Sequence, residues 1–143
     1  MKSTVLTTMF ALTVTGCASI AGQDDCGGGY QRTVDIHYGD SELRVTPPVQ
    51  RVFRSGSFVL RLKPSKRGSD TVDYETVKVT VEGKSGDDGK AADWIKKETA
   101  TYDTASEHSI GYCVPEMEDE GEQYYGIVVE GVGELDPRVD VRR

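Results

Sequence analysis

The feature that most constrains the fold is a series of short runs in which apolar and polar residues alternate. The clearest run is Val72–Glu82, where Val77, Val79 and Val81 alternate with polar side chains. Alternation with a period of two is typical of a half-buried strand, and β-branched residues favour strands. Glycine, proline, aspartate and serine separate the runs and indicate turns. Similar runs occupy residues 30–38, 43–45, 57–63, 109–114, 124–130 and 139–141, and a weaker one occupies 49–53.

About seven short strands are therefore expected, with no long amphipathic helix. Residues Ala91–Thr99 leave room for one or two helical turns, and Trp94 and Ile95 are expected to hold this crossing segment against the core. Chains of this kind fold as two layers of sheet. We predict an all-β, antiparallel two-sheet sandwich with an Ig-like architecture. A small closed β-barrel is the alternative.

The N-terminus has the form of an export signal. Lys2 is followed by an uncharged run, Val5–Val14, which is too short to span a bilayer as a helix. The run ends in Val14-Thr15-Gly16-Cys17, which resembles the lipobox of bacterial lipoproteins. The resemblance implies cleavage before Cys17 and attachment of lipid to the Cys17 thiol and to the new amine. An ordinary secretory signal cleaved after Ala21 is the alternative.

The lipobox resemblance also implies a division of the chain into segments and a cellular location. It implies a signal peptide at 1–16, a lipidated cysteine and short tether at 17–29, and a single domain at 30–143. Ala18 after the cysteine, where aspartate would favour inner-membrane retention, implies the outer membrane, and we expect the periplasmic face. The ordinary-signal alternative implies a soluble periplasmic or secreted protein.

The cysteines support an exported protein. If Cys17 carries lipid, Cys26 and Cys113 remain, and an oxidising compartment lets them pair. We predict a Cys26–Cys113 disulfide; two unpaired thiols are the alternative. A zinc site has less support, because only His37 and His108 are available to join the cysteines and no ligand spacing is present. We predict no metal and no cofactor.

Charge is segregated along the chain. Residues 43–69 hold seven basic and no acidic residues, whereas residues 98–137 hold eleven acidic residues and no lysine or arginine. One hypothesis is a basic face and an acidic face that bind a partner. The other is that folding brings the two segments together as weak surface pairs. The candidate partner-binding residues are Arg51, Arg54, Arg61 and Lys63 in the first segment and Glu118, Asp119 and Glu120 in the second.

No catalytic motif is present, so we expect a protein that is not an enzyme. The net charge of −7 argues against nucleic acid as a partner. The expected function is a membrane-anchored binding or assembly module of the cell envelope, with the membrane and an envelope protein as partners. A small acidic inhibitor of a cationic enzyme such as a lysozyme is the alternative. Calcium binding by the acidic residues 116–122 is a weaker one.

Overall fold

The computed structural model describes residue 26 and residues 30–66, 72, 74–86 and 89–143. This part of the chain contains eleven β-strands and no helix, and hence no helix with the length and apolar character needed to cross a bilayer. The strands are β1 (Gln31–Tyr38), β2 (Leu43–Thr46), β3 (Val49–Phe53), β4 (Ser57–Pro64), β5 (Thr76–Gly83), β6 (Lys90–Ala91), β7 (Glu98–Asp103), β8 (His108–Cys113), β9 (Gly121–Val129), β10 (Gly133–Leu135) and β11 (Arg138–Arg142).

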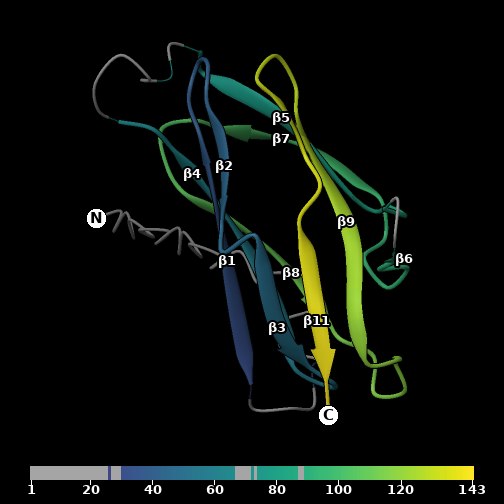
Figure 1. The fold of residues 1–143 in the computed structure, drawn as a ribbon. Helices are drawn as coiled ribbons and strands as arrows, with labels where there is room; N and C mark the ends of the chain where they lie inside the picture. Colours follow the sequence, from purple (N-terminus) through teal and green to yellow (C-terminus); the bar gives the residue numbers. More distant parts are fainter. Residues whose placement is uncertain (1–25, 27–29, 67–71, 73, 87–88) are drawn as a thin grey trace, which may run out of the picture.

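The strands form two sheets packed face to face (Figure 1). One sheet has four strands in the order β2-β1-β4-β8. The other has seven, with β3-β11-β9-β5-β7 as its main path and β10 and β6 each paired with β9. The expected all-β, two-sheet sandwich is confirmed. Each sheet ends in edge strands, so the described strands do not close into the alternative barrel.

The sheets are mixed, which corrects the expectation of antiparallel pairing throughout. β1 runs parallel to β4 from Gln31↔Ser57 to Tyr38↔Pro64, and β11 runs parallel to β3. Parallel neighbours need a crossover between them. Here β2 turns back along β1, β3 crosses to the other sheet, and the chain returns as β4 beside β1. Alternation within each run predicts a strand but carries no information about its direction.

The structure has more strands than the seven expected. β7 (Glu98–Asp103) was not predicted, because its only inward-facing residues, Ala100 and Tyr102, give a weak apolar pattern. Its pairing with β5 makes it a strand. The short strands β6 and β10 likewise depend on pairing with β9. In the ambiguous segment 91–99, β6 is followed by a single turn closed by a hydrogen bond from Ile95 N to Ala92 O at 2.9 Å.

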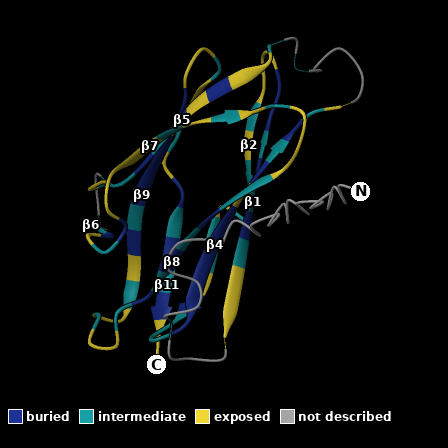
Figure 2. Cartoon of the chain, turned by 180° about the vertical axis from the view of Figure 1, so that it is seen from behind, coloured by how far each residue is buried: buried dark blue, intermediate teal, exposed yellow. Residues whose placement is uncertain are grey.

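Inward-facing side chains from both sheets form one core (Figure 2). The valines of β5 that alternate in the sequence are 0–3% exposed, which confirms that pattern. Ile95 is fully buried, and the Trp94 ring meets Phe58 edge-on at 6.0 Å, so the crossing segment is held to the core as predicted. The other members of the aromatic cluster around Phe58 are Tyr112 and Tyr125.

The disulfide end of the sandwich and the end where β7 finishes are formed by different strand ends. β1 and β4 begin, and β8 finishes, at one end, where Ser57 pairs with Cys113. β7 finishes at the opposite end, near the start of β8, where the rings of Tyr102 and His108 lie 5.2 Å apart. Because eight-residue strands such as β1 are roughly 26 Å long, the two ends are well separated.

Candidate functional site

The predicted disulfide is present. Cys26 and Cys113 are joined across a sequence separation of 87 residues, with their Cα atoms 5.3 Å apart. The bond fixes Cys26 to the last residue of β8, at the end of the sandwich where β1 begins. Cys17, the predicted lipidation site, lies outside the described residues, so its modification stays a prediction.

Two of the candidate basic residues, Arg61 and Lys63, lie on the outer face of the four-stranded sheet. Arg61 on β4 donates from Nε to Asp35 Oδ1 on β1 at 2.7 Å, and Lys63 Nζ lies 3.3 Å from Asp35 Oδ2. Partial burial of Asp35 disfavours its ionised form, but Arg61 and Lys63 outweigh this effect and lower the pKa of the carboxyl group. These two cations are therefore engaged within the sheet.

The other two candidates, Arg51 and Arg54, lie on β3 and just after it. The guanidinium group of Arg51 is 3.9 Å from the Asp140 carboxylate on β11, and its side chain is 64% exposed. The backbone N–H of Arg54 donates to Arg142 O at 3.0 Å. This pair is close to the disulfide end of the domain and separate from the Arg61–Lys63 pair. The four basic residues thus do not form one surface.

The acidic candidates Glu118, Asp119 and Glu120 lie in the acidic loop, residues 114–120, which joins β8 to β9. Lys90 Nζ contacts Glu118 at 3.1 Å and Asp119 at 3.0 Å, and these contacts raise the pKa of Lys90. Arg143 pairs with Glu120 at 3.1 Å. Among the described residues, no group of three or more His, Cys, Asp or Glu side chains is arranged to hold a metal ion.

A buried glutamine side chain is hydrogen-bonded to the acidic loop. Gln123 is 2% exposed; its Nε2 donates to Glu118 Oε1 at 3.0 Å and to Asp119 O at 3.2 Å. Its Oε1 accepts from Trp94 Nε1 at 2.9 Å. The crossing segment and the acidic loop are therefore tied together through one side chain. Sequence reasoning missed Gln123 and Lys90, because neither stands out by type or spacing.

The ion pairs found in the described part of the chain do not join the basic segment 43–66 to the acidic segment 98–137. Arg61 and Lys63 pair with Asp35, and Arg51 pairs with Asp140. The acidic segment pairs instead with cations outside the basic segment: Lys78, Lys84, Lys90, Arg138 and Arg143. Charge is neutralised locally, but not between the two segments that the sequence singled out.

An exposed sheet edge lies at the end opposite the disulfide. β7 pairs with β5 on one side, and no other described strand pairs with its second side. Four uncharged residues, Thr99–Tyr102, occupy its centre, with Thr99 and Thr101 exposed. Proteins usually protect edges with lysine, proline or a bulge. The centre of β7 carries neither lysine nor proline, so its backbone is suited to pairing with another extended segment.

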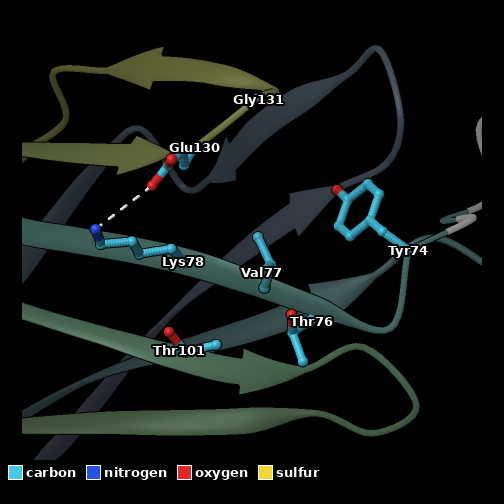
Figure 3. A pocket seen from close by; sticks show the side chains of 7 residues that line it. All are labelled: Tyr74, Thr76, Val77, Lys78, Thr101, Glu130 and Gly131. Atoms are coloured by element: carbon cyan, nitrogen blue, oxygen red, sulfur yellow. Dashed lines mark ion pairs between the residues drawn. The ribbon is translucent and has the colours of Figure 1, made fainter.

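A shallow depression of about 390 Å³ adjoins β7 (Figure 3). Thr76 and Lys78 of β5 and Thr101 of β7 form its floor, and Glu130 and Gly131 reach it from the β9–β10 turn. Lys78 Nζ and Glu130 Oε2 are 3.7 Å apart along the rim. Tyr74 closes the far side, and its hydroxyl donates to Gly39 O at 3.4 Å. A side chain from a segment paired with β7 has a recess of mixed polar and apolar lining beside it.

A second depression, of about 330 Å³, lies between β2 and the β10–β11 connection. Leu43, Val45 and Leu135 give it an apolar lining, and Arg44 and Arg138 stand at its margin. Arg138 is already engaged: it pairs with Glu122 at 2.8 Å and lies over the Tyr124 ring at 5.7 Å. β2, the nearest edge, has only four residues and offers less backbone than β7.

No protein-family model matches the chain, and no curated protein matches its sequence. Solved structures of auracyanins are similar at low identity. Auracyanin B is 12% identical with a TM-score of 0.44, over 79% of this chain and 89% of that chain. Dithionite-reduced auracyanin from the photosynthetic bacterium Roseiflexus castenholzii is 10% identical with a TM-score of 0.42, over 82% of this chain and 100% of that chain. At these values the likeness carries no argument about function.

Proposed function

We propose that the protein is a lipid-anchored, non-catalytic binding module of the bacterial cell envelope, held at the outer membrane through Cys17. The lipobox resemblance at residues 14–17 supports the anchor. Eight residues separate Cys17 from Cys26, which allows a span of at most about 30 Å. Because the disulfide fixes Cys26 to β8, the disulfide end of the sandwich is the membrane-proximal end.

The observation that carries the binding role is the unpaired edge of β7 at the opposite end. In an anchored domain this edge points away from the membrane, where a partner can reach it. Pairing with an extended segment gives affinity through main-chain hydrogen bonds, and recesses for alternate side chains give specificity. The depression beside Thr101 supplies such a recess. The partner is therefore an envelope protein that presents an extended segment.

The anchor is tested by the intact mass of the protein extracted from membranes, compared with a Cys17→Ser variant. We expect a chain that begins at Cys17 with an added acyl mass, and a Cys17→Ser variant that lacks this mass. A soluble, unacylated chain beginning near Gly22 contradicts the anchor.

The binding role is tested by photo-crosslinking in cells. A photoreactive residue at Thr101 is expected to give a discrete adduct with one envelope protein, identified by mass spectrometry. Adding Thr99→Lys should abolish the adduct, because an edge lysine opposes pairing with another strand. The control position is Glu116, which is exposed in the acidic loop at the other end. No adduct from Thr101, or the same adduct from both positions, contradicts the role of β7.

A further inference from the structure

Five arginines gather at the disulfide end of the domain, although only two of them belong to the basic segment of the sequence. The backbone explains the gathering, because Arg142 is the register partner of Phe53 and Arg54 N donates to Arg142 O. The side chains of Arg51, Arg142 and Arg143 are 50–78% exposed. We call this group the arginine end; it consists of Arg32, Arg51, Arg54, Arg142 and Arg143.

Two aromatic rings lie within the arginine end. The Tyr30 and Phe53 rings are 5.0 Å apart, and the Arg32 guanidinium lies 5.2 Å from the centre of the Phe53 ring. Tyr30 is 62% exposed, which is unusual for a large aromatic residue in the described part of this chain. Tyr30 directly precedes β1, and its carbonyl accepts a hydrogen bond from Ser57 N at 2.8 Å. The rings therefore stand where the chain enters the domain.

Carboxylates in contact with the arginine end balance only part of its charge. Asp140 is shared by Arg51 and Arg142, and Glu120 pairs with Arg143. Among the residues that the structure describes, these guanidinium groups form ion pairs with two carboxylates. The acidic loop lies at the same end of the molecule and contacts the arginine end through Glu120, whereas its Glu118 and Asp119 are held by Lys90 on the β9 side. Positive charge is therefore in excess on the side of β1, β3 and β11.

We propose that the arginine end is a docking surface for an anionic phospholipid bilayer. This inference rests on the proposed lipid anchor, which places Cys26, and with it Tyr30, within about 30 Å of the membrane. Arginines attract anionic head groups, and exposed aromatic rings with a polar tip are suited to the head-group region. Docking gives the anchored domain a defined orientation.

The orientation follows from the charge distribution. The side of β1, β3 and β11 lies against the bilayer, and the acidic loop is tilted away from the anionic surface. The edge of β7 then projects from the membrane at the opposite end. The net charge of −7 on the whole chain repels an anionic surface at long range, so binding depends on the local cluster.

The test uses the chain from residue 17 onward with Cys17→Ser, so that neither an acyl group nor the apolar run Val5–Val14 determines binding. Sedimentation is measured with vesicles of phosphatidylcholine alone and with vesicles that contain about 30% phosphatidylglycerol. We expect binding only to the anionic vesicles, and its loss in about 1 M salt, where the screening length falls to about 3 Å. Replacing both Arg32 and Arg51 by glutamine should weaken binding by tenfold or more, since each arginine near a surface contributes roughly fivefold.

The matched control replaces Arg44 and Lys66 by glutamine. These exposed cations lie toward the far end of the four-stranded sheet, and their loss changes the net charge by the same amount. We expect the control to bind like the parent. Equal weakening in both double variants, or equal binding to the two kinds of vesicle, overturns the proposal. The mass of the membrane-extracted protein tests the anchor separately, so failure of the anchor and failure of bilayer docking are distinguished by different measurements.

Discussion

At the scale of single residues, Gln123 is the polar side chain on which the acidic loop depends. It is buried and satisfies Trp94 Nε1, Glu118 Oε1 and Asp119 O together. Gln123→Leu keeps the volume but leaves the indole N–H and the Glu118 carboxylate without this partner. A buried polar group left unsatisfied costs about 1–3 kcal/mol. We expect the free energy of unfolding in urea to fall by that amount.

The matched control for this prediction is Gln50→Leu. Among the described residues, Gln50 donates to the neighbouring Arg51 carbonyl in an exposed position, so its loss should change stability by less than about 0.5 kcal/mol. Trp94 is the single tryptophan of the chain, and its fluorescence reports the contact directly. An unchanged emission spectrum together with unchanged stability in Gln123→Leu is the result that rules out the bracing role.

Residue-level patterns in the sequence predicted side-chain facing better than they predicted contacts. Alternation in the run 124–130 places Tyr124 and Tyr125 on opposite faces, and Tyr125 is fully buried while Tyr124 is half-buried. By contrast, the partners of Arg61 and Lys63 were not predicted, because Asp35 lies 26 residues before Arg61 and meets it only through the register of β1 and β4. Apolar–polar alternation predicts which face of a sheet a side chain lies on. Predicting a contact between two side chains also requires knowing which strands are paired and in what register.

At the scale of elements, the junction of β5 with the crossing segment is close enough to exclude any side chain. A Cβ atom on Gly83 would lie 2.2 Å from Ala92 O and 2.8 Å from Ala92 C, while Gly83 N donates to Ile95 O at 2.9 Å. Gly83→Ala must therefore displace the backbone of the crossing segment. We expect a loss of about 1–3 kcal/mol in urea unfolding, as for other overpacked sites.

Gly133→Ala in β10 is the control for Gly83→Ala. A Cβ there would have Leu43 Cδ2 as its nearest neighbour, at 4.0 Å. Replacing glycine where space and backbone permit is neutral or stabilises by up to about 1 kcal/mol. If the two variants unfold at the same urea concentration, close packing at Gly83 does not limit the stability of this junction.

Elements with strong apolar alternation were predicted from the sequence, and those that depend on neighbours were not. β5 and β4 were found because valines or leucines mark one face. β7, which carries the proposed binding edge, was missed because its stability comes from pairing with β5 rather than from its own pattern. Because β7 pairs with β5 on one side, its other side is the edge of the sheet in the described part of the chain. The candidate site was therefore the part least accessible to sequence reasoning.

At the scale of the whole molecule, the disulfide joins Cys26 to the last residue of β8. The chain-entropy relation gives about 4–5 kcal/mol for a cross-link that closes a loop of this length. Replacing Cys26 and Cys113 together by serine should lower the free energy of unfolding by up to that amount. A fold with typical stability of about 5–15 kcal/mol would persist, because the core lies between the sheets and does not include either cysteine.

The double variant also separates the effect of the disulfide on stability from its effect on the proposed distance between the domain and the membrane. If Cys17 is lipidated as proposed, loss of the disulfide moves the membrane-proximal attachment from Cys26 to Tyr30, whose carbonyl accepts a hydrogen bond from Ser57 N. The connection to the lipid then gains four residues, or at most about 14 Å. In the lipidated protein, cysteine replacement should therefore lower stability while leaving β7 able to crosslink, over a wider range of heights above the membrane. Reductant should lower the urea midpoint of the parent and leave that of the double variant unchanged. If parent and double variant have the same urea midpoint and neither responds to reductant, the disulfide does not limit unfolding. The pairing of β1 with β4 would then be sufficient to keep the disulfide end of the domain folded.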